Sequence, residues 1–329
     1  MRHFTTVTLL MAVVVLAALT FDARAADPAP QPAAATSPAK PAAIKRLMDD
    51  TTTTPEGCTI EKFRIVSPSM NREIKALVVL PPEYKDHPEK KFPILHTLHG
   101  AKSPIDRYLT MTPVLLQALK DKPMIVTCMD VDGFSWYLDS PYPQAIARNN
   151  DPTKVKSLFT TFFFDEFIPC LDQNYRINPQ QRMLTGNSMG GFGAFHYMLT
   201  KPNLFLSVSS LSGLFEKTDA DKKWEPLLGP LQEFPERHRA VDVFEHVNQV
   251  LKPGAKLPQL YMICGTEDPL LPHNRAMQRL LKEKGVTFEY QESPGKHGWP
   301  FWSEKLPAVI DFHWKSVQDQ ERPAKSNAK

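Results

Sequence analysis

The chain has 329 residues, 42% of which belong to the hydrophobic set, a fraction typical of a globular protein. Its 39 basic and 36 acidic residues leave a formal net charge of +3, and no run of Lys or Arg stands out. This balance excludes a nucleic acid or an anionic membrane surface as the expected partner. The length suits one large α/β domain, since such folds often reach about 250 residues as a single unit.

Residues 1–25 predict a signal peptide. A basic start precedes an apolar run, Val7–Leu19, that is too short to span a bilayer comfortably. The tripeptide Ala-Arg-Ala at 23–25 has the small-x-small pattern that a signal peptidase reads. We therefore expect cleavage before Ala26, a secreted or periplasmic product, and no stable membrane insertion after cleavage. An uncleaved membrane anchor is the alternative.

The next segment, residues 26–49, predicts a linker. It is rich in Ala and Pro and has no apolar period, so it is expected to stay extended rather than to pack a core. At the other end, the polar residues 319–329 predict a flexible tail. One domain, residues 50–318, is expected to contain the fold.

Within that domain, short apolar or β-branched runs alternate with longer amphipathic stretches. The predicted strands are Thr59–Val66, Glu73–Leu80, Phe92–Thr97, Met124–Met129, Arg182–Thr185, Phe205–Ser210, Leu257–Cys264 and Thr287–Gln291. The predicted helices are Pro104–Leu119, Val155–Tyr175, Gly190–Leu199, Ala240–Val250, His273–Lys284 and Trp302–Val317. This order indicates an α/β fold with a mostly parallel central sheet and helices on both faces. The first two strands have no helix between them and predict an antiparallel N-terminal edge.

Four cysteines, Cys58, Cys128, Cys170 and Cys264, lie far apart in the sequence, with no C-x-x-C spacing. Export would permit disulfides, and their pairing stays open. Two of the cysteines fall within strand-like runs, where a free cysteine behaves as a small hydrophobe. Free buried thiols are therefore favoured over disulfides, and neither a metal site nor a cofactor is expected.

The sharpest local signal is a G-x-S-x-G motif at residues 186–190. A strand-like run precedes it and a helical stretch follows it, which is the context of a nucleophile elbow. Such an elbow exposes its serine, here Ser188, at the carboxyl end of a strand. The next residue, Met189, would direct its N–H to a developing oxyanion from the helix N-terminus. A glycine-rich turn that merely begins a helix is the alternative.

A serine hydroxyl needs a base, and the base needs an orienting acid. In the α/β-hydrolase order the acid and then the histidine follow the serine. Asp268, where a predicted strand ends, and His297, in a glycine-bounded loop, fit that order. The neighbouring Glu267 competes for the role of acid, and Asp268 is favoured because it lies one residue further beyond the strand.

The loop after the third predicted strand reads Leu-His-Gly-Ala-Lys at 98–102. This loop supplies the second oxyanion donor in α/β-hydrolases, so the N–H of Ala101 is expected to join that of Met189. A simple turn is the alternative. Two aromatics of the long segment that follows, Trp136 and Tyr137, either line a substrate pocket or pack their loop onto the sheet.

With these residues in place, the chain resembles the Putative esterase family of α/β-hydrolases. That family includes S-formylglutathione hydrolases, tributyrin esterases, feruloyl and acetyl-xylan esterases, and mycolyltransferases. The matching stretches are LHG at 98–100, DGFSWYLDSP at 132–141, FIPCLDQNYRI at 167–177, GNSMGGFGAFHYML at 186–199, LSG at 211–213, GTEDPLL at 265–271 and GKHGWPFW at 295–302. The resemblance implies Ser188, Asp268 and His297 as the triad, with Ala101 and Met189 as oxyanion donors. Asn187 departs from the more usual Leu or Asp, which leaves the triad unaffected but bears on the pocket.

The expected function is therefore a secreted serine carboxylic-ester hydrolase that acts through an acyl-enzyme, on acyl or feruloyl esters of carbohydrates. The family's formylglutathione hydrolases carry cysteines near the His-Gly turn, and their absence here argues against that substrate. An acyltransferase of the same fold is one alternative, and a non-catalytic binding protein on a hydrolase scaffold is another. Oligomeric state and the identity of the ester stay open.

Overall fold

The computed structural model describes residues 44–103, 105, 112–145, 154–215, 224–251 and 257–322. These residues belong to one compact unit, Ala42–Lys329. The predicted signal peptide and residues 26–43 of the predicted linker lie outside the described residues. Among the helices that are described, none is both long and apolar enough to cross a membrane.

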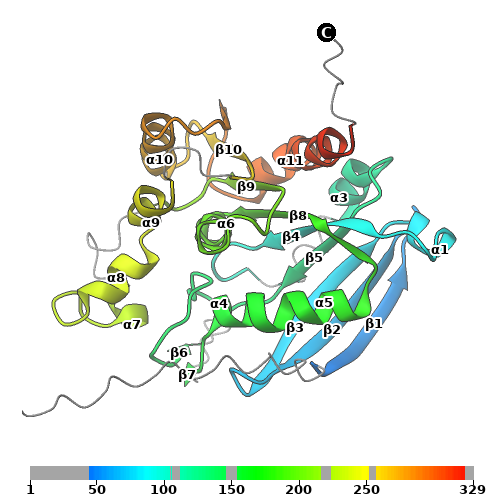
Figure 1. The fold of residues 1–329 in the computed structure, drawn as a ribbon, viewed down its shortest axis with the longest axis horizontal. Coiled ribbons are helices and arrows are strands. Elements are labelled where there is room, and N and C mark those ends of the chain that lie inside the picture. Colours follow the sequence, from blue (N-terminus) through cyan, green and yellow to red (C-terminus); the bar gives the residue numbers. More distant parts are fainter. Residues whose placement is uncertain are drawn as a thin grey trace, which may run out of the picture. The chain divides into compact units, whose positions relative to one another are not determined.

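A nine-stranded sheet forms the centre of the unit (Figure 1). Its strands are β1 (Arg46–Thr53), β2 (Thr59–Ser67), β3 (Arg72–Leu80), β4 (Phe92–Leu98), β5 (Ile125–Met129), β8 (Ile177–Asn187), β9 (Ser207–Leu211), β10 (Gln259–Gly265) and β11 (Glu289–Ser293). Their spatial order is β1-β2-β3-β5-β4-β8-β9-β10-β11. In this spatial order the last six strands, from β5 and β4 to β11, pair in parallel. Strands β1, β2 and β3 pair antiparallel. The mostly parallel sheet and its antiparallel N-terminal edge are thus confirmed.

Helices cover both faces of this sheet. The described helices are α1 (Glu83–Asp86), α3 (Thr112–Leu119), α4 (Phe159–Thr161), the π-helix η1 (Phe162–Phe167), α5 (Ile168–Asn174), α6 (Met189–Thr200), α7 (Glu225–Leu228), α8 (Pro235–Val241), α9 (Val243–Val250), α10 (Leu271–Glu283) and α11 (Trp299–Glu321). One core cluster contains side chains of η1, α5, α6, α9 and α10, and the clusters on the other face contain those of α3 and α11. Strands β4, β5 and β9 are buried along their whole length, which explains their unbroken apolar or small-residue runs.

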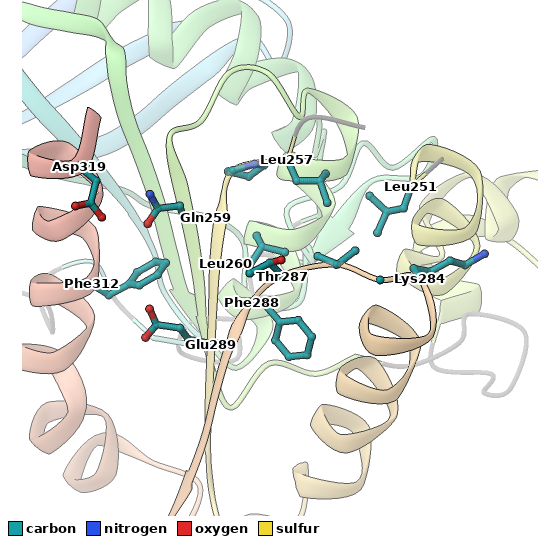
Figure 2. A pocket seen from close by; sticks show the side chains of 13 residues that line it. Leu251, Leu257, Gln259, Leu260, Lys284, Thr287, Phe288, Glu289, Phe312 and Asp319 are labelled. Carbon is teal, nitrogen blue, oxygen red and sulfur yellow. The ribbon is translucent and has the colours of Figure 1, made fainter. Parts of the chain in front are cut away.

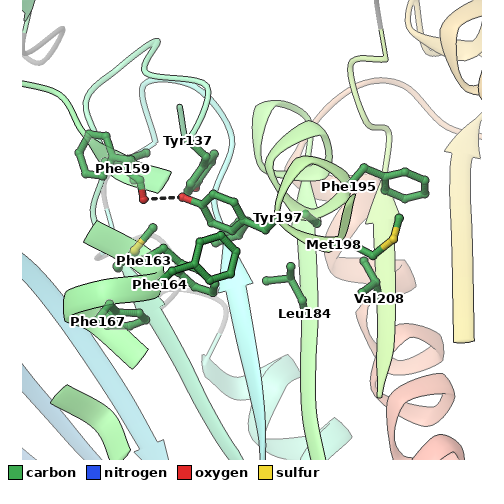
Figure 3. Close-up of a cluster of buried hydrophobic side chains, with 14 of the residues drawn as sticks. Tyr137, Phe159, Phe163, Phe164, Phe167, Leu184, Phe195, Tyr197, Met198 and Val208 are labelled. Atoms are coloured by element: carbon green, nitrogen blue, oxygen red, sulfur yellow. Dashed lines mark hydrogen bonds between the residues drawn. The ribbon is translucent and has the colours of Figure 1, made fainter. Parts of the chain in front are cut away.

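Aromatic side chains form much of the core on the α6 face (Figure 3). Tyr197 of α6 stacks on Phe163 of η1, with ring centroids 4.4 Å apart. The Tyr197 hydroxyl donates a 2.8 Å hydrogen bond to the carbonyl of Phe159 (Figure 3). Because a buried hydroxyl needs a partner, this bond ties α6 to the start of the α4–η1–α5 segment.

The ends of the domain differ from the sequence prediction. Strand β1 begins at Arg46 and crosses the expected boundary between residues 49 and 50, and α11 continues to Glu321, into the expected tail. Strand β1 is an edge strand with mostly exposed side chains, so its polar sequence carries no alternation that would reveal it. A short ribbon of β6 (Gln144–Ala145) and β7 (Lys154–Val155) was likewise not predicted.

Three of the cysteines, Cys58, Cys170 and Cys264, are buried free thiols. Burial and, to a lesser extent, the nearby Asp268 carboxylate raise the pKa of the Cys264 thiol to about 12. Cys128 is buried in β5. The expectation of free, buried cysteines is confirmed for the first three, and their protonated thiols serve as core packing.

Candidate active site

The carboxyl ends of the parallel strands carry the residues that the sequence singles out. Ser188 directly follows β8, Asp268 follows β10, and His297 follows β11. Strand β8 pairs in parallel with β9, β9 with β10, and β10 with β11. The carboxyl ends of these strands therefore lie at one edge of the sheet. This is the edge at which open α/β sheets bind their ligands.

The backbone at Ser188 is strained, with φ 57° and ψ −121°. Two glycines make this turn possible. A Cβ on Gly186 would lie 2.1 Å from the carbonyl oxygen of Gly190, and a Cβ on Gly190 would lie 2.0 Å from that of Leu98. No side chain fits in either place, so the G-x-S-x-G spacing follows from the close approach of β8, α6 and the end of β4.

The three predicted triad residues are brought together. His297 Nε2 lies 2.9 Å from Ser188 Oγ, and His297 Nδ1 lies 2.9 Å from Asp268 Oδ2 and 3.1 Å from Oδ1. A carboxylate only accepts, so Nδ1 carries the proton and Nε2 is left to accept from the serine hydroxyl. The loops that hold Asp268 and His297 are joined as well, because the Glu267 N–H donates to the Gly295 carbonyl at 3.0 Å.

Asp268 is buried, and its side chain is 0% exposed. Burial by itself raises the pKa of this carboxyl group, but hydrogen bonds from His297, the Ser212 hydroxyl and the Leu270 N–H outweigh it and hold the pKa below its usual value. The Leu270 N–H lies 2.8 Å from Oδ1. Asp268 is therefore a carboxylate at neutral pH and accepts the Nδ1 proton of His297.

Glu267 points away from this arrangement. Its side chain is 58% exposed, and its nearest cation, Lys296 Nζ, lies 4.0 Å away at the surface. Of the two adjacent acids, only Asp268 faces the histidine.

The two backbone amides predicted to bind an oxyanion belong to segments next to the serine. Met189 is the first residue of α6, and the turn of Ala101 directly follows β4. A Cβ on Gly100 would lie 3.3 Å from Ser188 Cβ, so the turn adjoins the serine. Within the described residues neither amide donates to another group. Both are thus available to an oxyanion at Ser188.

The two aromatics proposed for substrate binding lie largely in the core. Tyr137 is fully buried, and its hydroxyl donates to the His99 carbonyl. Trp136 is 9% exposed and packs on Phe192 and Trp224. Of the two interpretations in the sequence analysis, these contacts favour packing of the loop, and for Tyr137 they leave no surface for a substrate.

Ser212 was not identified from the sequence. It follows β9, has φ 50°, and is fully buried. Its hydroxyl accepts from Trp302 Nε1 at 3.2 Å and donates to Asp268, and Trp302 also meets the His297 ring edge-on at 4.9 Å. A serine at the end of a parallel strand next to the triad strands was the available signal, but local sequence does not show that its hydroxyl reaches the acid.

A cavity of about 800 Å³ lies at the opposite edge of the sheet, at the amino ends of β10 and β11 (Figure 2). Its lining includes Leu260, Phe288 and Phe312, and it contains no triad residue.

The described parts of the chain contain no group of three His, Cys, Asp or Glu side chains arranged to hold a metal ion. The contacts from Asp268 through His297 to Ser188 support proton transfer and nucleophilic attack by these side chains.

Comparisons with known proteins identify a family and relatives of this chain. The family model described as Putative esterase matches residues 67–312. An acetyl esterase of Caldicellulosiruptor saccharolyticus is 24% identical over 282 residues, which are 78% of this chain and 98% of that protein. The diacylglycerol acyltransferase/mycolyltransferase Ag85A of Mycobacterium leprae is 23% identical over 280 residues, 76% of this chain and 81% of that protein.

The fold has solved counterparts. An S-formylglutathione hydrolase from Agrobacterium tumefaciens matches with a TM-score of 0.70 at 18% identity, over 82% of this chain and 99% of that one. At this identity the likeness shows a shared fold and leaves the substrate undefined. The family match covers most of the chain, from the end of β2 to Phe312 within α11, and so shows that this chain belongs to the Putative esterase family of α/β-hydrolases.

Proposed function

We propose that the protein is a serine carboxylic-ester hydrolase in which Ser188 is the nucleophile, His297 the general base and Asp268 the orienting acid. The observation that carries this proposal is the unbroken chain of hydrogen bonds from Asp268 through His297 to Ser188 Oγ, with distances of 2.9 Å at each step. Family membership makes ester hydrolysis the reaction class that fits this chain of contacts.

The reaction proceeds in two halves. His297 Nε2 takes the proton of Ser188 as Oγ attacks the ester carbonyl, and the N–H groups of Met189 and Ala101 stabilise the oxyanion. His297 then returns the proton to the departing alcohol, which leaves an acyl-enzyme. Water repeats the sequence and releases the acid. No step requires a metal or an organic cofactor.

Substrate and compartment are part of the proposal. The acetyl esterase relative supports short acyl esters, and feruloyl esters of carbohydrates are the second substrate class that we propose to test. The apolar N-terminal run and its Ala-Arg-Ala site support export with a mature N-terminus at Ala26. N-terminal sequencing of protein from the native host tests the export proposal, and an intact Met1 on a membrane-bound product contradicts it.

Acyl transfer is the second candidate, favoured by the similarity to the mycolyltransferase of Mycobacterium leprae. It shares the acyl-enzyme and differs only in the acceptor, a sugar or lipid alcohol in place of water. Product analysis with a p-nitrophenyl ester in the presence of trehalose or glycerol separates the two. Free acid as the sole product supports hydrolysis, and an ester of the added alcohol supports transfer.

Ser188→Ala tests the core of the proposal. This change removes the nucleophile and leaves the oxyanion donors, so turnover of p-nitrophenyl acetate should fall to near background, with at most about 10³-fold acceleration over water remaining. A fluorophosphonate probe should label the wild type and not the variant. Wild-type turnover by the Ser188→Ala protein, or an unlabelled wild type, would refute the proposed function and leave the fold unaffected.

A further inference from the structure

The oxyanion turn, residues 99–102, is bound by two buried side chains, those of His99 and Tyr137. We propose that His99 and Tyr137 are positioning residues, which orient the Ala101 N–H toward Ser188. This inference rests on the proposed function and deepens it, because it names what keeps one of the two oxyanion donors in place.

The argument begins with the planar peptide between Gly100 and Ala101. Its carbonyl and its N–H point in opposite directions, because the group is planar and the described peptides are trans. A group that binds the Gly100 carbonyl on one side therefore aims the Ala101 N–H to the other side. The turn itself adjoins the serine, since a Cβ on Gly100 would lie 3.3 Å from Ser188 Cβ.

The Gly100 carbonyl accepts from the Ser103 N–H at 3.3 Å and is also bound by the buried His99. Its side chain is 0% exposed, and Nδ1 lies 2.8 Å from the Gly100 oxygen. The other ring nitrogen, Nε2, accepts from the Val131 N–H at 3.2 Å, which assigns the proton of the neutral ring to Nδ1. Nδ1–H therefore donates to the Gly100 carbonyl.

Tyr137 binds the preceding peptide. Its hydroxyl donates to the His99 carbonyl at 2.8 Å. The ring lies against α6, where a Cβ on Gly193 would come within 2.6 Å of Tyr137 Cδ2. A positive φ of 62° at this buried residue shows that the surrounding structure imposes its position. Tyr137 thus connects the turn to the helix that begins with the other donor, Met189.

The two donors come from different elements, the turn after β4 and the first residue of α6. Oxyanion stabilisation depends on donors that are in place before charge develops, because reorientation during the reaction would consume the gain. A looser turn should therefore weaken binding of the transition state and leave binding of the ester itself nearly unchanged.

Tyr137→Phe tests this inference, with Tyr197→Phe as the matched control. Each change removes one buried hydroxyl that donates at 2.8 Å to a main-chain carbonyl, and both rings belong to the core on the α6 face (Figure 3). Only the Tyr137 hydroxyl binds the oxyanion turn, since that of Tyr197 binds Phe159. The two variants should therefore lose similar stability and differ in catalysis.

We expect Tyr137→Phe to lower kcat for p-nitrophenyl acetate about 10-fold with an unchanged KM, a part of the 10²–10³-fold that loss of a whole oxyanion donor costs. Affinity for an aryl trifluoromethyl ketone, which forms an oxyanion on Ser188, should fall by the same factor. His99→Gln, whose amide nitrogen is at the ε and not the δ position and so loses the Gly100 contact, should show the same split between kcat and KM. Tyr197→Phe should retain kcat and ketone affinity.

Two results would overturn the inference in distinguishable ways. If the wild type turns over esters and is labelled at Ser188, but Tyr137→Phe loses no more kcat than Tyr197→Phe, the positioning role is wrong and the proposed function stands. A loss of kcat in Tyr137→Phe without a loss of ketone affinity would also refute the positioning role and leave the proposed function standing. A wild type that neither hydrolyses esters nor reacts with the probe would overturn the proposed function, and this inference with it.

Discussion

The substitution Asp268→Asn keeps the size of the side chain and removes its charge, and the surrounding donors determine which way the new amide faces. The Leu270 N–H lies 2.8 Å from Oδ1 and requires an acceptor there. The amide oxygen of Asn therefore occupies the Oδ1 position, and the amide NH₂ occupies that of Oδ2, 2.9 Å from His297 Nδ1. The NH₂ group donates, so Nδ1 must accept.

This reversal changes the tautomer of the histidine. With Nδ1 accepting, the single proton of the neutral ring moves to Nε2, which then donates toward Ser188 Oγ and is unable to take its proton. We expect kcat to fall about 10⁴-fold, the effect of the equivalent change in serine proteases, or about 5.5 kcal/mol of transition-state stabilisation. Folding should persist, because the substitution keeps the size of the side chain and the Leu270 N–H retains its acceptor.

The assay is the kcat of Asp268→Asn for p-nitrophenyl acetate, with circular dichroism to verify the fold. Glu267→Gln is the matched control, since it neutralises the adjacent acid, whose side chain is 58% exposed and lies beside Lys296. This control should retain wild-type kcat within about twofold. A severe loss in Glu267→Gln together with a mild loss in Asp268→Asn would refute the assignment of the acid.

Two further predictions concern stability and the elbow. Burial lowers the pKa of His196 and that of His313 to about 3, so both are neutral in the folded chain and titrate near 6.5 once unfolded. The stability that each neutral ring contributes to the folded state is fully present above about pH 6.5. It is lost as the pH falls toward 3, by about 1.4 kcal/mol per pH unit for each group. In urea titrations below pH 6, the free energy of unfolding of His313→Gln should fall less steeply with decreasing pH, by the contribution of one histidine. An unchanged slope of this free energy against pH would contradict the prediction. Gly190→Ala places a methyl group 2.0 Å from the Leu98 carbonyl and should abolish activity. Gly285→Ala, with nothing within 4 Å, should cost about 1–2 kcal/mol for its positive φ and retain kcat; equal activity of the two variants would rule out the close approach.

Much of the fold follows from local sequence. Alternating apolar runs and amphipathic stretches determined the order of strands and helices, because burial on both faces requires continuous apolar strands. The G-x-S-x-G motif identified the elbow, since only glycine fits where β8, α6 and the end of β4 approach one another. Strand β1 was missed because an exposed edge strand needs no apolar face.

The tertiary structure decided which side chains meet. Glu267 and Asp268 are adjacent and chemically alike, and only the path of the chain after β10 directs one to His297 and the other to solvent. Ser212 and Tyr137 reach the site from β9 and from the loop after β5, far from Ser188 in the sequence. Their contacts depend on strand order and on the burial of each hydroxyl, which are properties of the assembled sheet and are not encoded in any local pattern.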